Sequence, residues 1–184
     1  LILAGVLVVQ IDLVASLKQE VEKRQQEEQR RMALEKALAI PLASGRVTVN
    51  EGRIGISGSV LFAPGSDELR PEGRQLLTSL VQPLRVYLRE RDEMLMVSGF
   101  TDNKLLRGGN QRFTDNLELS AQRALTVTRA LIDEGMPASQ VFAAAFGAEQ
   151  PVASNDDDSG RAQNRRVEMA PVPKASNTKP AQHG

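Results

Sequence analysis

The first 17 residues, LILAGVLVVQIDLVASL, constrain the chain most, because so apolar a run is hard to place on the surface of a soluble fold. Its length is at the short end of the roughly 17 to 25 residues that cross a bilayer as a helix. A cleaved signal peptide is the rival interpretation, but VASLKQE is a poor cleavage site. We therefore expect residues 1–17 to be a retained transmembrane helix. Because the sequence starts without methionine, we also expect residues upstream of Leu1.

Residues 18–44 are expected to carry this helix into water as a charged stalk. The segment KQEVEKRQQEEQRRMALEKAL consists almost wholly of strong helix formers, with acids and bases three and four residues apart. Its apolar residues are too sparse for a coiled-coil seam. A solvated helix that ends near Pro41, Ser44 and Gly45 is therefore predicted.

The composition argues against several classes of function. Lys plus Arg and Asp plus Glu both total 23, so no basic excess favours nucleic-acid binding. Cysteine is absent and the single histidine, His183, lies in the C-terminal tail, so a histidine triad or a zinc site lacks its residues. No paired carboxylates share a motif suited to glycosidic cleavage, which disfavours a wall hydrolase. We expect a protein that is not an enzyme and that needs no metal or cofactor.

From residue 45 the patterns predict an α+β domain. RVTVNEGRIGISGSVLF alternates as a β-hairpin does, with its turn at residues 50–52. Leucines at helical spacing follow in residues 71–93, where Pro83 is expected to kink or split the helix. A second periodic helix is predicted in residues 116–135, preceded by a capping box of Asp115 and Glu118.

Three further strands are expected at MLMVSGF, VFAAAFG and RRVEMA. The resulting order β, α, β, α, β, β predicts a sandwich in which helices cover one face of a mixed sheet. The domain is expected over residues 45–170, and a disordered tail over residues 171–184. NDDDSG, residues 155–160, is expected to be a solvated loop.

Five segments of this domain resemble, in order, the motifs of the OmpA-like peptidoglycan-binding family. They are LFAPGSDELRPEG (61–73), GFTDN (99–103), NLELSAQRALTVTRAL (116–131), FGAEQPVASN (146–155) and GRAQNRRVEM (160–169). OmpA C-terminal domains, Pal lipoproteins and MotB flagellar stator subunits share this fold. The resemblance implies a βαβαββ sandwich in the bacterial envelope that binds peptidoglycan without being an enzyme.

The resemblance also implies a site for the diaminopimelate residue of the peptidoglycan stem peptide. The Asp of the family's TD pair and the Arg of its LSxxRA motif correspond to Asp102 and Arg123. Further family positions correspond to Thr101 in the TD pair, Asn116 at the start of the helix, Arg165 in NRR and Gly65 after Phe62. Diaminopimelate ends in an ammonium beside a carboxylate, which suits one acid with one or two Arg forks. For Asn116, a simple helix cap is the alternative.

The segment NKLLRGGNQRFTD, residues 103–115, is longer than the family's usual connection between these motifs. Its Gly108–Gly109 pair and its basic residues Lys104, Arg107 and Arg112 predict an elongated loop beside the ligand. Such a loop either widens the grip on the stem peptide or covers the site, and the sequence leaves both open.

Asp12 is an acid inside the expected membrane helix. A carboxylate there is costly and usually serves an ion pathway or a polar partner helix. Gly5, Ala15 and Ser16 fall near the same helix face, which permits close helix packing. This layout resembles the B subunits of ion-driven stators such as MotB and ZorB, which assemble with a multi-spanning A subunit. Only five residues separate Asp12 from Lys18, so an interfacial position is the alternative.

Together these patterns predict a single-pass protein of the bacterial inner membrane whose C-terminal domain lies in the periplasm. Peptidoglycan is the expected partner of the domain. A homodimer is expected for a single-span stalked protein, and a stator A subunit is the partner in the second interpretation.

Overall fold

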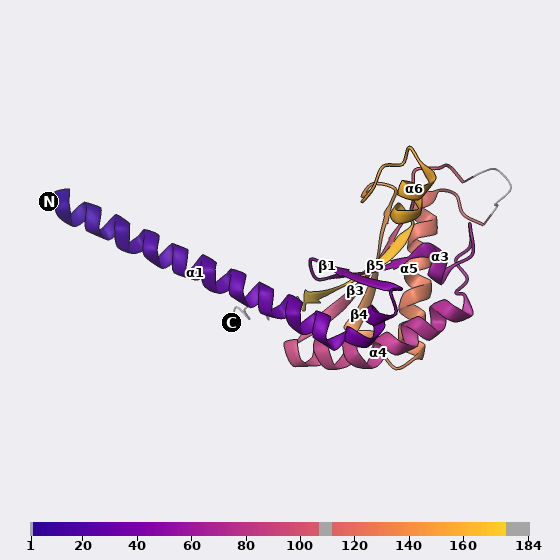
Figure 1. Cartoon of the computed structure of the whole chain (residues 1–184), viewed down its shortest axis with the longest axis horizontal. Helices are drawn as coiled ribbons and strands as arrows, with labels where there is room; N and C mark the ends of the chain where they lie inside the picture. The colour runs from indigo at the N-terminus through magenta and orange to yellow at the C-terminus, as the bar shows by residue number, and fades with distance from the viewer. Residues whose placement is uncertain (1, 107–111, 176–184) are drawn as a thin grey trace, which may run out of the picture.

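One long helix, α1 (Ile2–Ala37), leads from the N-terminus into the body of the protein (Figure 1). The computed structural model describes residues 2–106 and 112–175. The 36 residues of α1 extend over about 54 Å at the rise of an α-helix. Its N-terminal part is exposed in the isolated chain and is long and apolar enough to cross a membrane. The predicted single apolar helix in front of the domain is confirmed.

Five strands form one mixed sheet in the order β1-β2-β5-β3-β4. The strands are β1 (Val47–Asn50), β2 (Arg53–Ser57), β3 (Glu93–Phe100), β4 (Val141–Gly147) and β5 (Arg166–Pro173). All neighbours are antiparallel except β3 and β4, which are parallel. The predicted α+β class with a mixed sheet is confirmed, and the first hairpin turns at Glu51 and Gly52 as expected.

Two helices cover one face of this sheet. They are α4 (Pro71–Arg91) and α5 (Asn116–Asp133), which contact each other and β3. α4 is continuous through Pro83, so the predicted split does not occur. At the start of α5, Asp115 accepts the Glu118 N–H at 2.8 Å and the Glu118 carboxylate accepts the Thr114 N–H. Asp115 therefore caps α5 as predicted, while Glu118 bonds the residue before the cap instead of closing the capping box.

The sequence patterns missed the short elements. These are α2 (Ala39–Ala43), α3 (Gly58–Leu61), the 3-10 helix η1 (Ala138–Gln140) and α6 (Asp158–Asn164). The loop predicted at residues 155–160 is wrong in its second half, because the Asp157 carboxylate accepts the Gly160 N–H and starts α6. The tail predicted from residue 171 begins too early, because β5 continues to Pro173 along β3. Residues 176–184 of that tail, including His183, lie outside the described residues.

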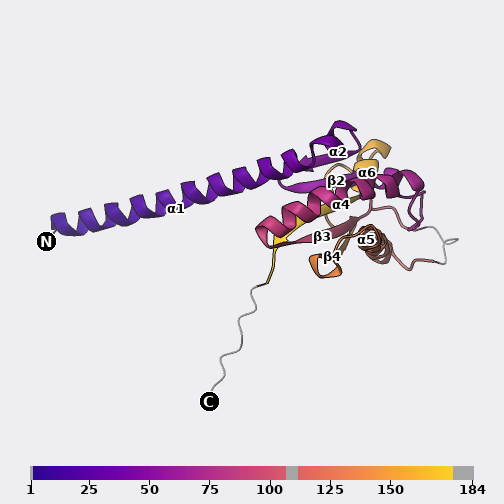
Figure 2. The same ribbon diagram turned by 90° about the horizontal axis from the view of Figure 1, so that it is seen from below.

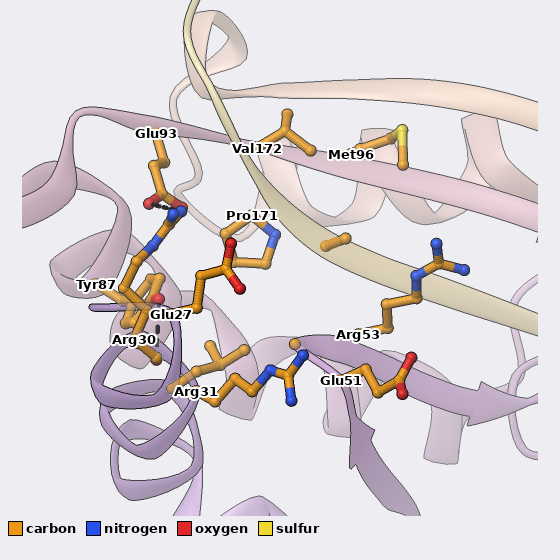
Figure 3. A pocket seen from close by; sticks show the side chains of 13 residues that line it. Glu27, Arg30, Arg31, Glu51, Arg53, Tyr87, Glu93, Met96, Pro171 and Val172 are labelled. Carbon is orange, nitrogen blue, oxygen red and sulfur yellow. Dashed lines mark hydrogen bonds and ion pairs between the residues drawn. The ribbon is translucent and has the colours of Figure 1, made fainter. Parts of the chain in front are cut away.

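The C-terminal turns of α1 pack into the domain instead of remaining solvated. Leu34 and Leu38 are 1% and 0% exposed in the main core. Arg30 forms an ion pair with Glu93 at the start of β3, and the Tyr87 hydroxyl donates to the Arg30 carbonyl at 3.3 Å (Figure 3). These contacts surround a hollow of about 400 Å³ between α1, the first hairpin and β5. The core thus extends across the domain boundary predicted at residue 45.

At the other end of the sheet, α5 lies unusually close to β3. A Cβ atom on Gly99 would lie 2.1 Å from the carbonyl oxygen of Ser120, so only glycine permits this approach. Ser120 is fully buried, and its hydroxyl donates to the Leu117 carbonyl and accepts the Gly147 N–H. This contact fixes the N-terminal half of α5 against the ends of β3 and β4.

Candidate functional site

The predicted site residues gather where β3 ends and β5 begins. β3 starts at Glu93 beside the stalk, and its eight residues span about 26 Å at the rise of a strand. Phe100 at its far end pairs with Arg166, the first residue of β5. Helix α6, which precedes β5, accordingly lies away from the free end of α1 in both views (Figure 1, Figure 2). The site is therefore at the end of the sheet opposite the stalk contact.

Asp102 is the acid of this site and is held on both oxygens. Its Oδ2 atom lies 2.5 Å from Nη1 of Arg165, and its Oδ1 atom accepts the Lys104 N–H at 3.0 Å. Asp102 is 7% exposed, whereas the Arg165 side chain is 43% exposed. The acid is therefore fixed, and its guanidinium partner faces solvent.

Arg123 is the buried cation of the site. Its Nε donates to the Ser66 carbonyl at 2.9 Å, and its guanidinium lies 5.0 Å from the ring centre of Phe62. Burial is the main cause that lowers the pKa of Arg123, and the positive charge of Arg165 lowers it further. A buried guanidinium in this setting is stabilised by a negatively charged ligand.

The acid and the two arginines therefore share one site. The family resemblance assigned Asp102 and Arg123 to the same ligand, and in the structure the ion pair of Asp102 is with Arg165. The reason is tertiary, because Arg123 directs its Nε toward the loop after α3. Asp102 still raises the pKa of Arg123 through its charge, as expected of neighbouring groups.

Thr101 and Asn116 support the backbone around Asp102. Thr101 is 4% exposed, and its hydroxyl donates to the Asp102 carbonyl at 2.9 Å. The Asn116 amide donates to the carbonyls of Asp102 and Lys104, at 3.3 and 2.9 Å. Since Asp115 is the N-cap of α5, the cap alternative for Asn116 is wrong. Both side chains hold the turn that presents the acid.

A hollow of about 340 Å³ lies beside Arg123. Gly65, Arg70 and Arg165 line it, together with the start of α3 and apolar residues of the loop that follows α3. Gly65 has a φ of +68°, which glycine adopts without strain, so this loop can turn at the edge of the hollow. The predicted residues Gly65, Arg123 and Arg165 thus meet at one cavity.

The described end of the long 103–115 segment reaches the same loop. Arg112 lies 2.9 Å from an oxygen of Asp67 and 3.6 Å from one of Glu68. Arg107 and the Gly108–Gly109 pair lie outside the described residues. The segment is therefore tied to the loop that carries Ser66, the partner of Arg123.

Sequence reasoning missed a buried polar residue, Asn164, that directly precedes Arg165 and ties the end of α6 to the loop after β4. Asn164 is fully buried, and its Oδ1 accepts the N–H groups of Val152 and Ala153 at 2.8 and 3.0 Å. Its Nδ2 donates to the Ala153 carbonyl at 2.9 Å. The signal was present in the GRAQNRR motif, where an Asn directly precedes the arginines.

Asp12 belongs to a different part of the molecule. It is exposed on α1 in the isolated chain, about 33 Å along the helix from Leu34 at the rise of an α-helix. Any role of Asp12 in an ion pathway is therefore separate from the site at Asp102.

Comparison with known proteins places this geometry in a family. Residues 61–165 match the OmpA family. A curated relative, the probable lipoprotein YiaD of Escherichia coli K12, is 36% identical over 120 residues, which cover 65% of this chain and 51% of YiaD. The chain spans about half the length of the curated relatives that it matches.

Two solved structures share the fold at similar identity. The first is a putative MotB like protein from Desulfovibrio vulgaris, with a TM-score of 0.69 and 30% identity over 82% of this chain and 98% of that one. The second is the cell wall anchor of the T6SS from Pseudomonas aeruginosa, with a TM-score of 0.62 and 31% identity over 74% and 94%. The match over residues 61–165, more than half of the sequence, includes every predicted site residue of the domain. The chain therefore belongs to the OmpA family, with its domain behind a single apolar helix.

Proposed function

We propose that the protein anchors a membrane to the bacterial cell wall by binding peptidoglycan through the diaminopimelate residue of the stem peptide. The observation that carries the proposal is the group of Asp102, Arg165 and the buried Arg123 around one end of the sheet. Membership of the OmpA family and the structural likeness to the cell wall anchor of the T6SS from Pseudomonas aeruginosa support the wall as the partner.

The chemistry of the site matches the end of the diaminopimelate side chain. Its ammonium binds the fixed carboxylate of Asp102, and its carboxylate binds the guanidinium of Arg123. Arg165, which is half exposed, shares the ligand carboxylate once the ammonium has taken its place beside Asp102. Binding exchanges one ion pair for another and breaks no covalent bond, so the protein acts without being an enzyme.

The test compares two stem peptides that differ only in the third residue, diaminopimelate or lysine. Lysine keeps the ammonium and lacks the carboxylate, so it loses the contact with Arg123. Titration calorimetry of the full chain in detergent micelles is expected to show about tenfold tighter binding of the diaminopimelate peptide. Equal affinity for the two peptides contradicts the proposed site.

The proposal includes the placement of the chain. An apolar α1 in the inner membrane puts the domain in the periplasm, where peptidoglycan is accessible. Gly5, Ala15 and Ser16 on α1 suit the close approach of a second copy, so a homodimer is part of the proposal.

A second candidate function is that of a stator B subunit, in which Asp12 carries the ion. The likeness to a MotB like protein and the acid within the apolar part of α1 favour it. A multi-spanning partner is then expected to co-purify with both wild type and Asp12→Asn, while ion flux in proteoliposomes is lost only in Asp12→Asn. Glu22→Gln on the exposed stalk is the matched control and keeps the flux. Purification of the chain without such a partner contradicts the stator function.

A further inference from the structure

The hollow beside Arg123 carries more positive charge than one ligand carboxylate neutralises. Arg70, Arg123 and Arg165 all line it, and no Asp or Glu of the described chain does. In the proposed function, Asp102 binds the ligand ammonium, and Arg123 and Arg165 share the side-chain carboxylate of diaminopimelate. The charge of Arg70, the third guanidinium at the hollow, is not neutralised by either of these groups.

Arg70 is held in place without being neutralised. Its Nη1 donates to the Ser59 carbonyl at 3.0 Å, which orients the fork. Its contact with an acid is Nε to Oε2 of Glu72 at 3.9 Å, between side chains that are 47% and 61% exposed. An exposed pair at this distance contributes little. The other donors of the fork can therefore bind a carboxylate at the hollow.

Besides Gly58 and Ser59 of α3, the remaining wall of the hollow is apolar and belongs to the loop after α3. Phe62, Ala63 and Pro64 form this part, and Phe62 also lies under Arg123. An apolar wall beside a guanidinium suits a carboxylate on a residue with a small apolar side chain. In the stem peptide, the alanine that follows diaminopimelate has a methyl side chain and, when it ends the peptide, a free carboxylate.

We propose that Arg70 binds the terminal carboxylate of this alanine, so that the protein selects stems that are not cross-linked. The inference rests on the proposed function. A cross-link consumes either the ammonium of diaminopimelate or the carboxylate of the following alanine. A site that binds both groups therefore recognises a stem in which neither has reacted.

The test uses a stem tetrapeptide that ends in alanine, as the free acid and as the C-terminal amide. Calorimetric titration of the full chain in detergent micelles is expected to show about tenfold tighter binding of the acid. Arg70→Gln is expected to bind the acid as weakly as wild type binds the amide, and to bind the amide as wild type does. Arg74→Gln, one turn further along α4 and outside the hollow, is the matched control and keeps the preference.

The outcomes separate this subsite from the proposed function. Equal binding of acid and amide by wild type, or an unchanged preference in Arg70→Gln, overturns the subsite. If the Arg70 subsite is overturned in this way but Arg123→Gln still weakens binding of both peptides, the proposed diaminopimelate site is kept and only the subsite is rejected. If wild type binds neither peptide, both proposals are overturned.

Discussion

Asp102→Asn is expected to weaken binding of the diaminopimelate stem peptide by at least about 100-fold, because it removes a buried carboxylate that pairs with the ligand ammonium. Asparagine keeps the oxygen that accepts the Lys104 N–H at 3.0 Å, so the turn after β3 should survive. Titration calorimetry of the full chain in detergent micelles measures the loss.

Asp156→Asn is the matched control for this substitution. Asp156 is exposed in the loop before α6 and does not line the hollow beside Arg123. Wild-type affinity is expected in the control, and the thermal unfolding temperature of both variants should stay near that of wild type. A folded Asp102→Asn variant with wild-type affinity contradicts the role of the acid.

Gly99→Ala is expected to produce a large loss of stability, because its new methyl group would meet the Ser120 carbonyl oxygen at 2.1 Å. The obstacle is backbone of α5, so either the helix moves off the sheet or the strand bends. We expect a loss of about 3 kcal/mol or more in the free energy of unfolding. Circular dichroism should show this as a fall in Tm of about 6–12 °C.

Gly55→Ala is the control for this prediction. Gly55 also lies within a strand, but its methyl group would meet only the tip of a side chain, Oγ1 of Thr48 at 2.9 Å. That side chain can rotate away, so a Tm shift below about 3 °C is expected. An unchanged Tm in Gly99→Ala contradicts the close approach of α5 that places Arg123 near Asp102.

Much of the fold was predictable because its signals are local. The alternation in residues 46–62 predicted the first hairpin, although its second strand ends at Ser57 and α3 follows, and the leucine spacing predicted α4 and α5. The short helix α6 was missed because only seven residues form it and no periodicity can develop. The docking of the stalk was missed for a similar reason, since it rests on the C-terminal part of the stalk, from Arg30 to Leu38, where too few apolar residues lie to form a recognisable stripe.

The candidate site shows the same division between local and tertiary information. Motif order predicted that Asp102, Arg123 and Arg165 gather at one place, and the structure brings them together. Which arginine pairs with the acid depends on the loop after α3, where Ser66 and Phe62 hold Arg123. Arg70 gave no signal of its own, because its place beside Arg123 depends on how α3 and α4 pack.

The central claim is that Arg123 binds the carboxylate of diaminopimelate, and its most direct test measures two proteins against two peptides. Wild type and Arg123→Gln are each titrated with the diaminopimelate stem peptide and with its lysine analogue. Wild type is expected to prefer the diaminopimelate peptide by about tenfold, and Arg123→Gln is expected to bind both peptides equally, at the affinity of wild type for the lysine peptide. A wild-type preference that survives in Arg123→Gln contradicts recognition of the diaminopimelate carboxylate by this arginine.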